Sequence, residues 1–421
     1  MRTDAMKTAI ATAAALLTAV VVLAPARFAA AQEDRPSAMK LFPAETVLWV
    51  RAADAGLLLE RLDQTSMAQL LRDPDMADLT DRVGGAFSDA YAQFVQEFLE
   101  ADLQDLLRLP QGEFAFGLVQ RQGGEPGLML IADFGAEAQV AQQVFERLQT
   151  LAEEDEASVG TEQLRSDEAT VIRDGNDQDK SVAVVRREST FVIANDRDLL
   201  QATLDHWDGI PVEPPLEASA GGSLDYEDEE SASEDVETDE ETNDADDEEP
   251  EPPPYAETLA SNNRFSATFR ELMPGNEEPP QGMFYIDPIG LLEATAGQQM
   301  GVRIAMATFP ALGVDGIQAF GAAMWLSTEK WDALVRGHLL LATPRSGVCK
   351  VARLETGEMT PPDFVPSSVE TLMSIRLKPT RLFDDIASLY NRFQYEGAFS
   401  EVGRREYLVE PAGRLRTRLC Q

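Results

Sequence analysis

The side chains that most often carry acid–base chemistry are unevenly supplied in this sequence of 421 residues. It holds only two histidines: His206 stands beside Trp207, His338 lies in an apolar run, and neither belongs to a catalytic motif. A histidine relay needs a nucleophile and an orienting acid around it, and no G-x-S-x-G motif supplies the nucleophile. The histidines by themselves therefore predict no active site.

Carboxylates are abundant, with 74 Asp and Glu residues, and two of them close together are able to act as general acid and base. This abundance makes any single pair uninformative. Asp54, Asp196 (or its neighbour Asn195) and Asp287 each stand between a predicted strand and a predicted helix, the N-cap position. We expect these aspartates to cap helices. The sequence assigns no catalytic, cofactor-binding or metal-binding residue and no cofactor.

Motifs for phosphate and metal binding are also missing, since the sequence has no P-loop, no H-E-x-x-H and no C-x-x-C. The polar segment 174–179 has its glycine second, whereas a calcium loop of the EF-hand type has it sixth, so we predict a hairpin turn. Cys349 and Cys420 are the only cysteines, too few for a disulfide-built fold. They either form one bond or, as we favour, remain two separate thiols.

Negative charge is concentrated in one stretch. Seventeen acidic residues lie between Asp225 and Glu251, and removing them from the net charge of −39 leaves −22. No Lys or Arg occurs from residue 198 to 263, and few apolar residues are present. Such a segment is expected to be disordered and extended. We expect diffuse, salt-sensitive binding of divalent cations there; a shaped site built from Asp244, Asp246, Asp247 and Glu249 is the alternative.

The net charge also excludes classes of partner. Nucleic acid is bound through neutralisation of phosphates by Lys and Arg, and anionic lipid surfaces attract the same residues. With 35 basic against 74 acidic residues, the chain is suited to neither.

The N-terminus has the features of a secretory signal peptide. Arg2 and Lys7 precede the apolar run 9–24, and Ala29-Ala30-Ala31 forms a cleavage site before Gln32. An uncleaved membrane anchor is the alternative. No later stretch reaches the ~20 apolar residues that span a bilayer, so we predict no membrane span after cleavage and a periplasmic or secreted location.

Around these residues the chain repeats one unit, a strand that leads into a helix. In residues 41–62 the run Thr46–Val50 is the strand and Asp54 the cap. Residues 283–293 repeat this arrangement, with Asp287 as cap and Pro288 in the first turn. Val365-Pro366 repeats Phe42-Pro43 and begins a partial third unit with strand 370–377 and helix 381–392.

Hydrophobic periodicity predicts the remaining elements. The predicted helices are 66–71, 76–109, 137–151, 198–207, 265–273 and 289–308. The further strands are 112–120, 128–132, 170–173, 182–186, 190–194, 316–326 and 331–342. Short hairpins between strands favour an antiparallel sheet. The predicted fold is therefore α+β: tandem units of antiparallel sheet with helices packed on one face, separated by a disordered acidic linker.

The composition also predicts the boundaries. We expect a signal peptide over 1–31, a first α+β unit over 32–210, an acidic and Pro-rich linker over 211–257, a second α+β unit over 258–362 and a partial third unit over 363–421. The third unit is too small to bury its apolar faces, so its strand is expected either to complete the sheet of the second unit, which we favour, or to pair with another chain.

Four short boxes resemble those of exported repeat proteins of unknown function of the planctomycete type. They are LFPAET at 41–46, GEFAF at 112–116, PRSG at 344–347 and PPDFVP at 361–366. The resemblance implies tandem α+β units behind a signal peptide, and it brings no active-site residue with it.

These observations together favour an exported, non-enzymatic structural or interaction protein of the periplasm or cell envelope, with another envelope protein as its partner. The alternative is an extracytoplasmic hydrolase that uses carboxylate chemistry.

Overall fold

A computed structural model describes residues 35–76, 109–121, 125–154, 157–175, 177, 180–211, 255–273, 278–329, 331–351, 364–366 and 378–400. The predicted signal peptide, most of the predicted helix 76–109, nearly all of the predicted acidic linker, the predicted strand 370–377 and Cys420 lie outside the described residues.

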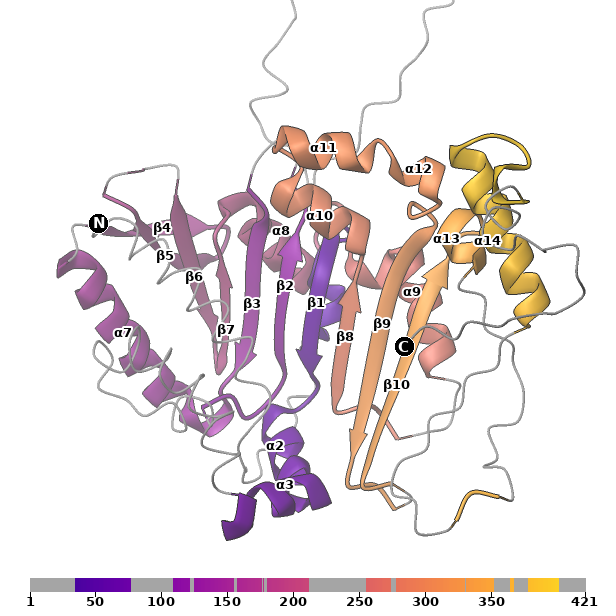
Figure 1. Ribbon diagram of the computed structural model, residues 1–421. Helices are drawn as coiled ribbons and strands as arrows, with labels where there is room; N and C mark the ends of the chain where they lie inside the picture. The colour runs from indigo at the N-terminus through magenta and orange to yellow at the C-terminus, as the bar shows by residue number, and fades with distance from the viewer. Residues whose placement is uncertain are drawn as a thin grey trace, which may run out of the picture. The chain divides into compact units, whose positions relative to one another are not determined.

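Within the described residues, ten strands form one antiparallel sheet in the order β10-β9-β8-β1-β2-β3-β7-β6-β5-β4 (Figure 1). The strands are β1 Thr46–Ala52, β2 Phe114–Val119, β3 Gly127–Asp133, β4 Ser158–Leu164, β5 Asp167–Arg173, β6 Ser181–Arg187, β7 Thr190–Ala194, β8 Gly282–Ile286, β9 Ile317–Leu326 and β10 Ala333–Leu341. The prediction of an α+β chain with an antiparallel sheet is confirmed.

The described helices are interspersed with the strands along the chain. The longer ones are α2 Ala55–Gln64, α3 Ser66–Leu71, α7 Ala138–Glu154, α8 Arg197–Asp208, α9 Asn263–Leu272, α10 Pro288–Ala296, α11 Met300–Met306, α12 Phe309–Leu312, α13 Gly347–Val351 and α14 Pro379–Phe393. Single 3-10 turns are η2 Ala38–Lys40, η3 Pro74–Met76, η5 Gly135–Glu137 and η7 Leu259–Ser261. No helix among these is both long and apolar enough to cross a bilayer.

The chain divides into two compact bodies. The larger body comprises residues 1–286 and 321–337, and the smaller body comprises residues 287–320 and 338–421. β8 and α9 belong by sequence to the second predicted unit, but β8 pairs with β1 in the larger body, with Trp49 opposite Tyr285. Strands from both sides of the acidic stretch therefore share one sheet.

Helices of the larger body cover both faces of this sheet. On one face, Ala55 and Leu58 of α2 pack on alternate residues of β1, β2 and β3, and Ala141 of α7 packs on Val184 and Phe191. On the opposite face, the Thr203 hydroxyl of α8 lies 2.9 Å from the Met129 sulfur. The prediction of helices on one face only is wrong, because the central strands are apolar on both sides and each side needs a cover.

An aromatic cluster lies between β1 and α9, on the sheet face that α8 covers. Trp49 of β1 is fully buried, and its ring meets Phe265 at 5.3 Å and Phe269 at 6.4 Å, both edge to face. Phe42 packs on the same ring at 6.4 Å. Gly117 of β2 lies opposite Trp49, and a Cβ there would stand 2.6 Å from the Phe42 ring. The glycine thus makes room for the aromatic ring that precedes Pro43.

The smaller body contains α10–α14. Asp385 of α14 is buried and accepts from Lys350 of α13 at 2.8 Å. The buried Cys349 thiol donates to the Gly313 carbonyl at 3.1 Å, and burial raises the pKa of this thiol. Cys420 lies outside the described residues, so the choice between a bond and two thiols stays a prediction.

Two differences from the predicted elements have causes in the chain. β4 was not predicted, because its sequence SVGTEQL has only two large apolar residues. The predicted helix 289–308 is interrupted after α10, because Gln299 adopts an extended conformation with ψ 123° before α11 begins. In β10 the apolar side chains of Val335 and Leu339 are exposed, at 65% and 49%.

Candidate functional site

The three aspartates predicted as caps all hold that position. Asp54 accepts from Leu57 N at 2.7 Å at the start of α2, and Asp287 accepts from Gly290 N at 2.9 Å at the start of α10. Asp196 accepts from two N–H groups of α8, the nearer at 2.8 Å. These side chains complete helix ends whose first N–H groups have no partner within the helix.

Three acidic residues gather at one end of the sheet. Asp54 follows β1, Glu113 precedes β2 and Asp133 ends β3, and antiparallel pairing brings these strand ends together. Desolvation raises the pKa of Asp54, and the negative charge of Asp133 adds to the effect. Asp133 accepts from the Ser189 hydroxyl at 2.8 Å and from Gly135 N at 3.0 Å.

Glu113 is buried and compensated on both oxygens. Arg35 and Arg51 each form an ion pair with it, and the Ala38 N–H lies 3.1 Å from both oxygens. A buried carboxylate is tolerated when it is paired and hydrogen-bonded in this way. Glu113 therefore fastens the chain segment that leads into η2 to the sheet.

A second group lies at the opposite end of the sheet. Arg121, just after β2, donates to Asp196 at 2.8 Å. Tyr255 is buried beside this pair, and desolvation followed by the charge of Asp196 raises the pKa of its hydroxyl. Glu45 and His206 interact electrostatically near the same segment.

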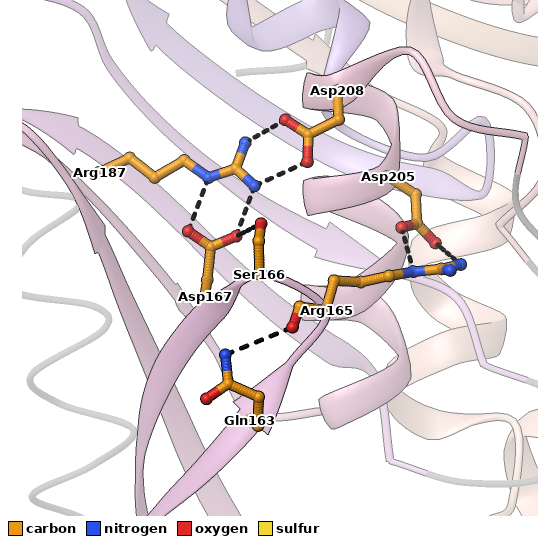
Figure 2. A network of polar contacts seen from close by, with 7 residues as sticks. All are labelled: Gln163, Arg165, Ser166, Asp167, Arg187, Asp205 and Asp208. Carbon is orange, nitrogen blue, oxygen red and sulfur yellow. Dashed lines mark hydrogen bonds and ion pairs between the residues drawn. The ribbon is translucent and has the colours of Figure 1, made fainter.

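A third network joins two hairpin tips to α8 (Figure 2). Arg187, at the end of β6, donates to both oxygens of Asp167 at 3.1 and 2.5 Å and to both oxygens of Asp208 at 2.6 and 2.8 Å. Although desolvation lowers it, hydrogen bonds to the two carboxylates raise the pKa of Arg187. Arg165 makes a second bidentate pair with the buried Asp205 at 2.9 and 3.2 Å.

The Glu113 network and the Arg187 network both contact Trp207. The guanidinium of Arg187 lies 5.3 Å from the indole ring and that of Arg35 lies 6.0 Å from it. Cations stack favourably on an indole face at these distances. These cation–π contacts and the ion pair between Arg187 and Asp208 hold the end of α8.

The two histidines lie in different settings. His206 is in the last turn of α8, with Nδ1 3.4 Å from the Leu41 carbonyl and Nε2 3.4 Å from the Ala256 carbonyl. His338 is half-buried within β10. Among the described residues, neither ring forms a hydrogen bond with a Ser or Cys side chain.

Six carboxylates are buried among the described residues. Each has a donor in the structure: they are Glu113, Asp133, Asp196, Asp205, Asp287 and Asp385. In the part of the chain that the structure describes, no three His, Cys, Asp or Glu side chains are grouped as metal ligands. The predicted turn at 174–179 closes by hydrogen bonds between Asp174, Asp177 and Lys180, which confirms a hairpin between β5 and β6.

The partners of Glu113 and Arg187 were not predicted from the sequence. Arg35 and Glu113 are 78 positions apart, and Arg187 and Asp208 are 21 apart. No spacing rule of helices or strands joins such positions, and a chain rich in acids offers many equivalent partners.

Comparison with known proteins returned no counterpart: no protein-family model, no curated protein and no solved structure matches this chain.

Proposed function

We propose that this chain is an exported, non-enzymatic structural or interaction protein of the periplasm or cell envelope. Five of the six described buried carboxylates serve as helix caps or ion-pair partners, namely Glu113, Asp196, Asp205, Asp287 and Asp385. This use of the carboxylates favours a binding role over catalysis.

A row of exposed apolar side chains on α14 carries the proposal. Phe383, Ile386, Tyr390 and Phe393 recur at steps of three and four, which places them on one helix face. They are 60%, 39%, 39% and 49% exposed, and the Phe399 ring packs edge to face on Phe383 and Tyr390. Exposed apolar rows of this kind mark protein–protein contacts. The partner that fits is an envelope protein with an apolar surface.

Site-specific photo-crosslinking in the native envelope tests this function. A photo-reactive amino acid at Phe393 is expected to give one dominant adduct, whereas the same residue at the exposed Ser388 of α14 is the matched control. The Phe383→Gln variant is expected to reduce the Phe393 adduct. Equal adducts from positions 393 and 388, or an adduct unchanged by Phe383→Gln, would refute the proposal.

The hydrolase remains a second candidate because of one observation. Asp54 has a raised pKa and a second carboxylate, Asp133, close enough to influence it, as a general acid would. Its hydrogen bond from Leu57 N accounts for its position as a cap. Hydrolysis of ester, amide or glycoside substrates by the mature protein, abolished in Asp54→Asn, would favour this candidate instead.

Export and the acidic linker belong to the same proposal. Cleavage before Gln32 is supported by the Ala29-Ala30-Ala31 box, and N-terminal sequencing of the native protein checks it. The finding of Met1 on the mature protein would refute export with cleavage. For the linker, calcium binding that weakens as salt rises is expected, and a stoichiometric isotherm at 0.15 M salt would instead indicate a shaped site.

We further propose that the chain contains two units that share one pattern of strand, capping aspartate and helix. β1 leads into α2 through Asp54, and β8 leads into α10 through Asp287 and Pro288. This shared strand, cap and helix supports tandem units on either side of the acidic linker. Relatives in which only one unit is present would support a duplication.

A further inference from the structure

His206 occupies a position in which its protonation state changes how many contacts it makes. Its two ring nitrogens each face a backbone carbonyl oxygen at 3.4 Å, that of Leu41 and that of Ala256. A carbonyl oxygen only accepts. A neutral imidazole has one N–H, so it satisfies one of the two oxygens, whereas an imidazolium donates to both.

The two carbonyls belong to segments far apart in the chain. Leu41 follows η2, and Ala256 is separated by Tyr255 alone from residues 212–254, which include the acidic stretch. Beyond Ala256 the same segment is tied to the chain ahead of β1. Ala44 N donates to the Glu257 carbonyl at 2.9 Å, and Leu259 N donates to the Phe42 carbonyl at 2.6 Å.

Tyr255 and Ala256 are held differently from the residues that follow them. Tyr255 adopts a φ of +64°, an unfavourable conformation for a residue other than glycine. The hydrogen bond from His206 to Ala256 joins this turn to the end of α8.

Several charged and titratable groups surround His206. Glu45, ahead of β1, attracts its charge, and Glu257 lies close enough to influence Glu45. On α8 itself, Asp205 and Asp208 are paired with Arg165 and Arg187, and the guanidiniums of Arg187 and Arg35 flank the adjacent Trp207. Tyr255 contributes a hydroxyl whose raised pKa keeps it neutral. The C-terminus of α8 adds a partial negative charge.

We propose that His206 is a pH-dependent latch that holds the exit of the acidic stretch, at residues 255–257, to the larger body. When the ring is protonated, it donates to both the Leu41 and the Ala256 carbonyls. When the proton leaves, one of the two hydrogen bonds is lost and the attraction to Glu45 disappears. Histidine changes its charge between about pH 5 and 8. The latch is therefore closed on the acid side of that range and loosens as pH rises.

Hydrogen exchange of the full mature chain, corrected for the intrinsic rate at each pH, tests the latch. The protection of the backbone amides at 255–257 is expected to fall about tenfold between pH 5.5 and 8, the effect of one charge-assisted hydrogen bond. In His206→Gln this fall should vanish, and in the matched control His338→Gln it should persist. Protection that does not change with pH, or a fall that persists in His206→Gln, would overturn the proposal.

A measurement on the unsubstituted His206 ring tests the proposal even if the His206→Gln variant does not fold. With only two histidines in the chain, the ring nitrogens of His206 are assigned in a ¹⁵N-histidine sample by comparison with His338→Gln. At pH 5.5 both nitrogens of His206 are expected to show the shift of protonated nitrogen. A single neutral tautomer at pH 5.5 would refute the latch.

Discussion

At the residue scale, the described buried charges act as fasteners between segments that are distant in sequence. Glu113 joins the segment before η2 to β1 and β2 through Arg35 and Arg51, and Arg187 joins two hairpins to α8. Glu113 has two cationic partners and Arg187 has two anionic partners, so each central charge holds two other charged groups in place. Removal of one partner leaves the others desolvated and unpaired.

Glu113→Ala is expected to destabilise the protein strongly. Arg35 and Arg51 expose only 9% and 15% of their side chains, so both would lose their counter-charge with little access to water. We expect a loss of about 3 kcal/mol in the free energy of unfolding, measured by urea titration. Glu168→Ala, at an exposed position of β5, is the control and should change it by under about 0.5 kcal/mol. A loss below about 1 kcal/mol for Glu113→Ala would contradict its role as a fastener.

Asp54 gives a prediction about pH. Because desolvation raises its pKa in the folded state, the unfolded state loses its proton first as pH rises above the ordinary value of 3.8. The folded state binds more protons in that window, so the ionisation of Asp54 lowers stability as pH rises. Asp54→Asn keeps a capping oxygen without the charge. Its stability relative to the original protein should therefore increase from pH 3.5 to pH 7 in urea titrations.

Asp54→Ala separates the cap from the charge. It loses the hydrogen bond to Leu57 N and should cost about 1 kcal/mol relative to Asp54→Asn at every pH. If the stability of Asp54→Asn relative to the original protein falls as pH rises, the folded protein stabilises the Asp54 carboxylate, which contradicts the prediction.

At the element scale, the sequence predicted most strands and helices of the described residues, because their apolar periodicity is strong. The runs that became β1, β3, β7, β9 and α9 contain β-branched, aromatic or regularly spaced apolar residues. β4 lacked this signal, and the break between α10 and α11, where Gln299 is extended, is not marked in the apolar pattern. Which face of a strand is covered is a tertiary property, so periodicity could not assign helices to both sides of the sheet.

The candidate site was predictable only in part. Asp54, Asp196 and Asp287 could be recognised as caps because capping is a local interaction. The partners of Glu113, Arg187 and His206 are fixed by strand order, which the sequence does not encode in any spacing.

Gly117→Ala tests how the aromatic cluster depends on β2. The added methyl group would stand 2.6 Å from the Phe42 ring and 3.0 Å from the Leu48 carbonyl, so either the ring or the strand must move. We expect a loss of about 1–3 kcal/mol in the free energy of unfolding. Gly160→Ala in β4 is the matched control, since nothing lies within 4 Å of its added Cβ, and it should be neutral or slightly stabilising. Equal effects at the two glycines would refute close packing of Phe42 on β2.

At the whole-molecule scale, the larger body is assembled from both sides of the acidic stretch. β8 pairs with β1 along five residues of each strand, from Leu48 opposite Ile286 to Ala52 opposite Gly282. α9 places Phe265 and Phe269 against Trp49. Covalent continuity through residues 212–254 is therefore not what joins these elements.

A single cut in the acidic stretch is expected to leave the protein assembled. With a specific protease site inserted at residue 232, cleavage yields two fragments that share the β1–β8 pairing and the buried Trp49 cluster. They should elute together in native gel filtration and separate in 6 M urea, because backbone pairing and apolar burial both resist dissociation. The uncut protein with the same insertion is the control. Fragments that separate without denaturant would show that the two sides are independent domains, and the pairing of β8 with β1 would then be too weak to organise the sheet.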